Sequence, residues 1–314
     1  MARAFVFPGQ GSQAVGMGKE LAEASPVARE VFEEIDEALQ QRLSRLMFEG
    51  PEDELRLTAN AQPALMAVSL ATLRVLEREG GMATPRAAKF VAGHSLGEYS
   101  ALCAAGALPL PEAARLLRRR GQAMQEAVPV GVGAMAALLG LELDAAREVA
   151  ETARQGQVCD CANDNAPGQV VISGPTAALE GAAASLKAAG AKRVLPLRVS
   201  AAFHSPAMRA VAPDLAAAIA ATALGELRVP VIANVDAAMH TRMSDFPGLL
   251  ERQVWSPVRW VAVMRCAAGE GATRFIEFGA GSVLSALAKR ILPDARASAV
   301  SDPATLEEAL SVLR

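Results

Sequence analysis

The chain has few aromatic residues, histidines and cysteines, and no excess of positive charge. Of its 314 residues 4% are aromatic, three are His and four are Cys, and 31 basic against 34 acidic residues give a formal net charge of -3. Neutralising nucleic-acid phosphates or an anionic membrane requires a basic surface, so the charge argues against both as partners. With 52% hydrophobic and 21% charged residues, the chain is expected to bury a large core.

Long apolar runs are also missing. The longest uncharged runs, 127–141 and 165–179, contain Pro or Gly and are too short for a membrane-spanning helix. The N-terminus leads directly into 4–9 without the features of a signal peptide. The cysteines show no disulfide framework, and Cys159-Asp160-Cys161 lacks the spacing and the His pair of a zinc site. We therefore expect a cytoplasmic protein without a metal site.

Short apolar runs alternate with helical patterns, which is typical of an α/β protein. Within 134–198 the order becomes β-α-β-β-α-β, the ferredoxin-like pattern, bounded by Pro129-Val130-Gly131 and by Val199-Ser200. The sequence thus predicts a large α/β-hydrolase-like subdomain with a parallel sheet, residues 1–128 and 199–314, and an inserted ferredoxin-like α+β subdomain, residues 129–198. The cleft between them is the expected binding site.

The sharpest local motif is Gly93-His94-Ser95-Leu96-Gly97, which follows a predicted strand, 88–92, and opens a predicted helix, 96–105. This is the context of a G-x-S-x-G nucleophile elbow, where the turn requires glycine and presents the serine at a helix N-terminus. The main-chain N–H of Leu96 would then face a developing oxyanion. The alternative is a glycine-rich turn with a capping serine.

A serine nucleophile needs a base, and the chain offers three histidines. His94 adjoins Ser95, so we expect it to be structural with its side chain pointing away, and His240 lies in a polar loop, 236–244, where we expect exposure. His204 follows the exit from the inserted subdomain, and elimination favours it. No acid sits convincingly at a strand end to complete a triad. A backbone carbonyl could instead hold the imidazole tautomer.

Arg120 lies on the apolar stripe of the helix predicted at 112–127, whereas Arg118 and Arg119 point to an expected solvated face. A buried guanidinium must be paired, and a bidentate carboxylate is its best partner. Two interpretations stay open: an internal salt bridge, or a clamp for the carboxylate of a ligand.

The loop after the first strand contains Gly9-Gln10-Gly11 and, three residues on, Ala14, which could be a dinucleotide-binding fingerprint. That interpretation needs an acidic residue ending a second strand about twenty residues on. The corresponding region, 25–39, reads as a polar helix. We favour an oxyanion loop in which Gln10 donates beside Ser95.

Several motifs recur together in one family. Their order and spacing resemble the malonyl-CoA:acyl carrier protein transacylases from Phe5 to the last helix; the motifs are Gly9-Gln10-Gly11-Ser12-Gln13, Gly93-His94-Ser95-Leu96-Gly97-Glu98-Tyr99-Ser100, Arg120-Gly121 and Phe203-His204-Ser205. The resemblance implies the catalytic and oxyanion groups: Ser95 as acylated nucleophile, His204 as base, Gln253 as the residue whose carbonyl orients the histidine, and Gln10 and Leu96 as oxyanion donors. It implies substrate-binding roles for Arg120, as malonyl-carboxylate clamp, and for Asn163, Asn165 and Phe203.

The resemblance also implies a ping-pong reaction with no bound cofactor. Malonyl-CoA would load the serine, and the phosphopantetheine thiol of a partner acyl carrier protein would take the malonyl group for fatty acid synthesis. The family further implies a monomer. Polyketide synthesis or malonate decarboxylation could use the same chemistry. A serine thioesterase or hydrolase, and a non-catalytic module that holds CoA or carrier protein, are the more distant alternatives.

Overall fold

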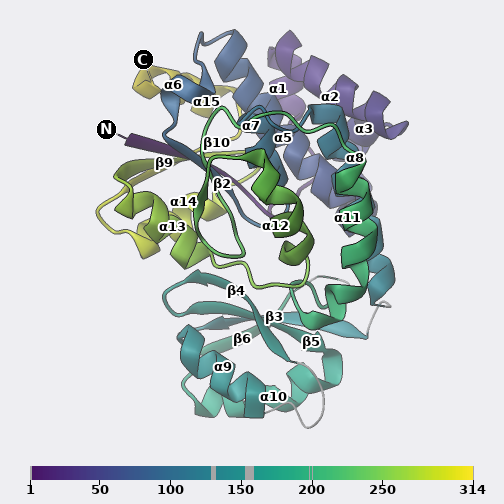
Figure 1. The fold of residues 1–314 in the computed structure, drawn as a ribbon, viewed down its shortest axis with the longest axis vertical. Coiled ribbons are helices and arrows are strands. Elements are labelled where there is room, and N and C mark those ends of the chain that lie inside the picture. The colour runs from purple at the N-terminus through teal and green to yellow at the C-terminus, as the bar shows by residue number, and fades with distance from the viewer. Residues whose placement is uncertain (1, 129–131, 153–158, 198, 200, 314) are drawn as a thin grey trace.

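Two β-sheets organise the molecule. The computed structural model describes residues 2–128, 132–152, 159–197, 199 and 201–313. In this part of the chain a six-stranded sheet lies in the upper body of Figure 1 and a four-stranded sheet in the lower. The two chain ends lie together in the upper body. The α/β class and the smaller second sheet predicted from the sequence are confirmed.

The large sheet has the order β10-β9-β1-β2-β7-β8, and every neighbouring pair is parallel except β7 with the edge strand β8. Its strands are β1 (Ala2–Phe7), β2 (Phe90–Gly93), β7 (Val231–Ile232), β8 (Met239–His240), β9 (Ala272–Phe278) and β10 (Arg296–Val300). Strand β1 alternates between the two faces: Phe5 and Phe7 join one apolar core, and Ala4 and Val6 join the other. Both faces are therefore covered, as parallel sheets require.

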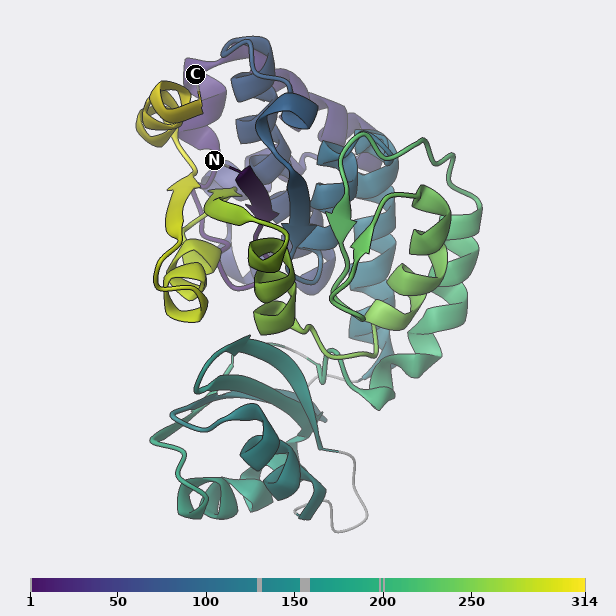
Figure 2. The ribbon, with the colours of Figure 1, turned by 60° about the vertical axis from the view of Figure 1, so that its left-hand side comes forward.

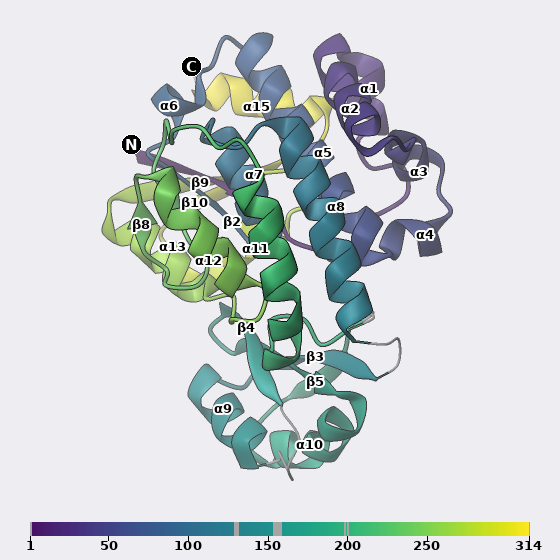
Figure 3. The ribbon, with the colours of Figure 1, turned by 45° about the vertical axis from the view of Figure 1, so that its right-hand side comes forward.

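Helices bury the two faces of this sheet. The larger core is built with α1 (Lys19–Ala24), α2 (Pro26–Leu39), α3 (Leu43–Glu49), α4 (Glu52–Arg56), α5 (Thr58–Arg78), α6 (Thr84–Ala87), α7 (Gly97–Ala104), α8 (Leu110–Ala127), α11 (Ala212–Ala220), α12 (Phe246–Gln253) and α15 (Pro303–Leu313), and with the 3-10 turns η1 (Pro206–Val211) and η2 (Met243–Asp245). The opposite face carries α13 (Trp260–Gly269) and α14 (Val283–Ile291). In Figure 3, α8 and α11 run side by side toward the small subdomain.

The small sheet has the order β4-β5-β3-β6 with antiparallel pairs throughout, the arrangement of a split β-α-β fold. It comprises β3 (Gly133–Leu139), β4 (Asp160–Ala166), β5 (Gln169–Pro175) and β6 (Arg193–Pro196), with α9 (Leu143–Thr152) and α10 (Thr176–Ala188) packed on it around a core of its own. The predicted boundary residues 129–131, 198 and 200 lie outside the described residues.

The small subdomain adjoins the carboxyl edge of the large sheet. In Figure 2 the purple and blue arrows of β1 and β2 point down toward it. Strand β4 continues into the large subdomain through a parallel bridge, in which Val258 N donates to Ala162 O at 2.9 Å and Asp164 N to Val258 O at 3.0 Å. Arg290 of α14 also donates to Pro167 O at 2.8 Å. Loops after β1, β2 and β7 therefore open against residues of the small subdomain.

Candidate active site

Ser95 sits in a turn that only glycine neighbours permit. A Cβ on Gly93 would lie 1.8 Å from Gly97 O, and one on Gly97 would lie 2.2 Å from Phe7 O. His94 N donates to Phe7 O at 2.9 Å, which joins the turn to the end of β1. Ser95 itself has φ 52°, a left-handed conformation that is strained for a residue with a side chain. The turn thereby lifts the serine hydroxyl off the end of β2.

His204 reaches Ser95 from the segment that leaves the small subdomain. Its Nε2 lies 2.7 Å from Ser95 Oγ, and its Nδ1 lies 3.0 Å from Gln253 O and 3.1 Å from Ser256 O. Carbonyl oxygens only accept, so Nδ1 carries the ring proton and Nε2 is left to accept from the serine hydroxyl. The hydroxyl is therefore aimed at a neutral imidazole nitrogen.

Burial sets the protonation state of this imidazole. The His204 side chain is 4% exposed. Desolvation, assisted by the positive charge of Arg120, lowers the pKa of His204 to about 3, although hydrogen bonds to the Gln253 and Ser256 carbonyls act in the opposite direction. The His204 imidazole is thus unprotonated at neutral pH and can accept a proton at Nε2.

Asn234 locks the elbow from the neighbouring strand. It follows β7, and its Oδ1 accepts from Ser95 N at 2.8 Å while its Nδ2 donates to Gly93 O at 2.7 Å. Both bonds brace the strained backbone at Ser95. Sequence reasoning missed Asn234. The available signal was a polar residue ending an apolar strand, at the sheet edge where parallel α/β folds place their sites.

Arg120 is enclosed beside Ser95. Its side chain is 1% exposed, and its Nη2 lies 3.2 Å from Ser95 Oγ. Nη1 donates to Gln62 Oε1 at 2.7 Å, and Nη2 also donates to Gln253 Oε1 at 3.0 Å. Gly121 allows this approach, because a Cβ there would lie 2.6 Å from Thr58 O at the start of α5.

The partners of Arg120 are uncharged. Among the described residues it forms no ion pair with a carboxylate, so the internal salt bridge considered from the sequence is not what the structure shows. Burial lowers the pKa of Arg120, and the nearby Tyr99 and Glu98 act against that shift. A buried guanidinium with amide partners still favours an anion, and an anion bound there would lie next to Ser95.

A small pocket of about 80 Å³ opens over these groups between the two subdomains. Its walls are formed by Gln10, Gln62, His94, Ser95, Leu96, Arg120, Met124, Met135, Asn163, Leu197, Val199, Phe203 and His204. Of the other predicted residues, Gln253 forms hydrogen bonds with Ser95, Arg120 and His204. Asn165 Oδ1 lies 2.8 Å from His94 Nε2. The structure therefore brings every predicted site residue to this pocket or to a residue that lines it.

Two main-chain donors at the pocket have no protein partner. Within the described part of the chain, the N–H groups of Gln10 and Leu96 donate to no protein atom. The Gln10 side chain is engaged elsewhere, because its Nε2 donates to Thr58 Oγ1 at 3.3 Å. Leu96 is the N-cap residue of α7, so its N–H lies at the positive end of a helix.

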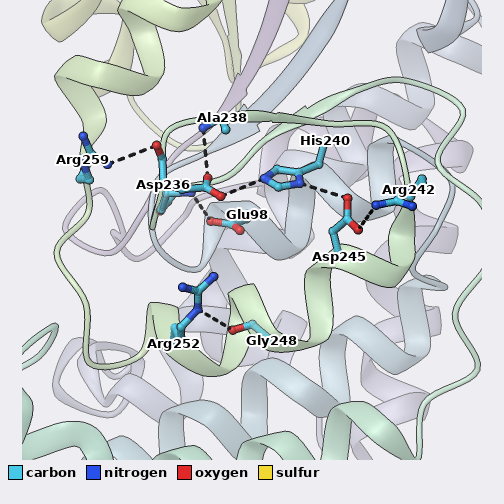
Figure 4. A network of polar contacts seen from close by, with 10 residues as sticks. Glu98, Asp236, Ala238, His240, Arg242, Asp245, Gly248, Arg252 and Arg259 are labelled. Carbon is cyan, nitrogen blue, oxygen red and sulfur yellow. Dashed lines mark hydrogen bonds and ion pairs between the residues drawn. The ribbon is translucent and has the colours of Figure 1, made fainter.

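The other two histidines have different surroundings. His94 is one of the residues that line the pocket, and its ring is held by Asn165 and Trp260. The prediction for His240 needs correction, because this residue is not exposed: its side chain is 17% accessible. Figure 4 shows its ring between Asp236 and Asp245, with Nε2–Oδ2 3.1 Å and Nδ1–Oδ2 3.2 Å. The acids of the polar loop fold back on the ring and shield it.

The two neighbours of Arg120 also differ from each other. Arg119 is exposed, as expected, and pairs with Asp214 of α11. Arg118 is half-buried, contrary to expectation, and donates to Asn60 Oδ1 at 2.6 Å. Helix α2 and helix α5 pack close enough to α8 to cover part of the face that periodicity alone assigns to solvent.

Two kinds of feature are absent from the described residues. They contain no group of three or more His, Cys, Asp or Glu side chains placed to hold a metal ion. In the same ranges, no helix combines the length and the apolar character needed to cross a bilayer.

The α/β fold of this chain combines a serine at an elbow, an imidazole in contact with that serine and two unengaged N–H groups. This combination defines an acyl transferase or a closely related serine enzyme. The chain matches the family model described as acyl transferase domain over residues 4–305. It is 47% identical over 312 residues to the malonyl CoA-acyl carrier protein transacylase of Bacillus subtilis, covering 99% of this chain and 97% of that one. It is 44% identical over 309 residues to the protein of that name from Escherichia coli, covering 98% and 99%.

Solved structures agree. An acyl-carrier-protein-S-malonyltransferase from Bartonella henselae superposes with a TM-score of 0.97 at 48% identity, covering 100% of this chain and 99% of that one. A malonyl-transacylase solved in complex with its type II polyketide acyl carrier protein gives a TM-score of 0.96 at 42% identity, covering 99% and 100%. The chain belongs to the acyl transferase family and, within it, to the malonyl CoA-acyl carrier protein transacylases. The resemblance inferred from the sequence is confirmed.

Proposed function

We propose that this chain transfers the malonyl group of malonyl-CoA to the phosphopantetheine thiol of an acyl carrier protein, through a malonyl ester on Ser95. The observation that carries the proposal is the buried Arg120, whose Nη2 lies 3.2 Å from a serine hydroxyl that is 2.7 Å from a neutral imidazole. A diacid thioester can place its carbonyl at the serine and its free carboxylate at the guanidinium. The family supports the same substrate pair.

In the first half-reaction, His204 Nε2 takes the proton of Ser95 Oγ as the oxygen attacks the thioester carbonyl. The N–H groups of Leu96 and Gln10 stabilise the tetrahedral oxyanion. The carbon–sulfur bond then breaks, and the sulfur of CoA leaves with the proton held by His204. In the second half, the carrier thiol gives its proton to His204, attacks the ester carbonyl and displaces Ser95, which recovers the proton.

The orientation of the imidazole falls to the Gln253 carbonyl in this proposal, with the Ser256 carbonyl as a second acceptor. Both act where a triad would use a carboxylate. Asn163 and Phe203 form pocket wall against the acyl chain, and Asn165 holds His94 in that wall. Malonyl-CoA is a substrate here, and no resident cofactor or metal takes part in the proposed steps.

The partner of the second half-reaction is an acyl carrier protein, of fatty acid or polyketide synthesis. The chemistry at Ser95 is the same for both, and a relative of 42% identity has been solved with a polyketide carrier. We also propose a cytoplasmic monomer. Cys103, Cys161 and Cys266 are free thiols, which suits a reducing compartment.

The protonation state of His204 offers a test by NMR. Because burial lowers its pKa to about 3 from the ordinary 6.5, its ring is expected to stay neutral from pH 8 down to pH 5. In the unfolded chain the ring takes its proton near 6.5, so this group makes the folded state less stable as pH falls from about 6.5 toward 3. The imidazole resonance lost in His204→Gln identifies the signal. A titration midpoint near 6.5 in the folded protein would contradict the expectation.

The proposed function is tested by following labelled malonyl from malonyl-CoA to purified holo carrier proteins of both pathways. We expect a malonyl adduct on the enzyme by intact-mass spectrometry, and its transfer when carrier protein is added. Rapid release of free malonate without an acceptor would favour a hydrolase. No adduct at all would favour a non-catalytic binding module and refute the proposal.

A further inference from the structure

Glu98 is a buried carboxylate that the proposed mechanism does not use. It lies in the first turn of α7, three residues after the nucleophile, and is 0% exposed. Its Oε2 accepts from Gln253 Nε2 at 2.9 Å and from Asn234 N at 3.0 Å. Its Oε1 is buried and has no hydrogen-bond partner among the described residues. Burying a carboxyl group with one oxygen unsatisfied is costly, so its contacts with two site residues are informative.

Gln253 is the residue through which Glu98 can act. Its side-chain Nε2 donates to Glu98 Oε2 and, at 2.9 Å, to Ser95 O, while its Oε1 accepts from Arg120 Nη2. Its main-chain carbonyl accepts from His204 Nδ1. One residue therefore contacts the nucleophile's backbone, the guanidinium and the base.

The two ends of the Gln253 amide are chemically different, so its orientation matters. If the amide were reversed, its NH₂ group would face the Arg120 guanidinium and its oxygen would face the Glu98 carboxyl and the Ser95 carbonyl. Each of these contacts would then place two donors or two acceptors together, and its hydrogen bond would be lost. Glu98 and the Ser95 carbonyl together select the orientation that presents an oxygen to Arg120.

This function does not depend on whether Glu98 is ionised. Burial raises the pKa of Glu98 to about 7, with Asp236 acting in the same direction and Gln253, Asn234 and Arg120 acting against it. Tyr99, the other titratable group that faces it, has its own pKa raised to about 12 by burial and is neutral. If the proton resides on the unpartnered Oε1, Oε2 accepts the same two hydrogen bonds in both states.

We propose that Glu98 is a positioning residue, which fixes the Gln253 side-chain amide so that the Arg120 guanidinium is held in place beside Ser95. The inference rests on the proposed function and adds to it a determinant of acyl selectivity outside the pocket wall. Malonyl transfer needs the guanidinium in place, whereas acetyl transfer does not. Loss of Glu98 should therefore affect malonyl loading more than acetyl loading.

The test measures kcat/KM for formation of the Ser95 adduct from malonyl-CoA and from acetyl-CoA. Glu98→Leu removes both accepting contacts, and we expect malonyl loading to fall about 10- to 100-fold, as misplacement of a positioned group does, with a smaller fall for acetyl loading. Glu98→Gln retains an amide oxygen for both contacts. Its malonyl-to-acetyl ratio of kcat/KM should therefore stay within about threefold of the wild-type ratio, a smaller change than the one expected for Glu98→Leu.

Glu277 provides a matched control. It is also 0% exposed, and its carboxylate accepts from Leu284 N at 3.1 Å and Ser285 N at 2.7 Å at the start of α14, outside the pocket. Glu277→Leu removes a buried carboxylate of the same kind and is expected to lower the thermal midpoint while leaving the malonyl-to-acetyl ratio unchanged.

Each outcome decides the inference. A selective malonyl loss in Glu98→Leu, restored in Glu98→Gln, supports it, and equal losses for the two substrates overturn it. If Glu98→Leu does not fold, Glu98→Asp takes its place, because it withdraws the carboxylate by one methylene: a lower ratio supports positioning, and an unchanged ratio overturns it. Absence of a malonyl adduct in the wild-type protein would instead refute the proposed function.

Discussion

Replacing Ser95 with alanine is expected to abolish formation of the malonyl adduct and to lower the transfer rate on the order of 10⁶-fold, the scale at which a serine enzyme loses its nucleophile. The hydroxyl is the one group placed 2.7 Å from His204 Nε2 in the pocket, so no second nucleophile of the described residues is in line to replace it. Intact-mass spectrometry after mixing with malonyl-CoA measures the adduct directly, and peptide mapping places it.

Ser100→Ala is the matched control for this prediction. Ser100 lies on the helix that follows the elbow, is 0% exposed, and its hydroxyl has no hydrogen-bond partner among the described residues. Removing it should leave the adduct and the transfer rate near wild type. A malonyl adduct of normal yield in Ser95→Ala would mean that the acyl group is carried elsewhere, and the mechanism proposed for the elbow would fail.

Replacing Arg120 with alanine is expected to weaken malonyl loading strongly while acetyl loading survives or rises. Removing one partner of a buried, hydrogen-bonded charge pair typically costs about 2–5 kcal/mol. That corresponds to about thirty- to several-thousand-fold in kcat/KM for malonyl-CoA. Acetyl-CoA has no carboxylate to pair with the guanidinium. In the wild-type site its binding would leave a buried cation with uncharged partners only, and the substitution removes this disadvantage.

The measurement is the ratio of kcat/KM for malonyl-CoA to that for acetyl-CoA. Arg119→Ala serves as control, because Arg119 is the next residue on the same helix yet is exposed and paired with Asp214. Its ratio should match the wild type, since an exposed ion pair contributes little. If Arg120→Ala lowered kcat/KM equally for malonyl-CoA and acetyl-CoA, Arg120 would not be the carboxylate clamp, and its role would be structural.

Local sequence was sufficient where the constraint is local. The elbow could be recognised because a turn that tight leaves no room for a Cβ at Gly93 or Gly97, and steric exclusion of this kind acts within a few residues. Helical periodicity placed Arg120 on the buried face of α8 for a similar reason. His204 could be proposed by elimination because the chain has three histidines.

Exposure was misjudged for two side chains. His240 is shielded by Asp236 and Asp245, which lie in or beside its own loop, so the polarity of that loop did not imply exposure. Arg118 is half-buried against Asn60 of α5, a distant segment outside the helical pattern that was used to judge its exposure. The residues that brace the site from behind were missed for the same reason: Asn234 follows the short strand β7, and Gln62 lies on α5, 58 positions before Arg120.

The sequence by itself determined the α/β class, the inserted β-α-β-β-α-β unit, the serine at its turn and an arginine facing inward. These depend on the alternation of side chains along strands and helices and on the space that a backbone turn allows. Only the tertiary structure decided that Arg120 meets amides and no carboxylate, that His204 Nδ1 meets two carbonyls, and that Glu98 stands behind Gln253. Those pairings join residues that are between 49 and 155 positions apart in the sequence, so they follow from how the layers pack and not from any local pattern.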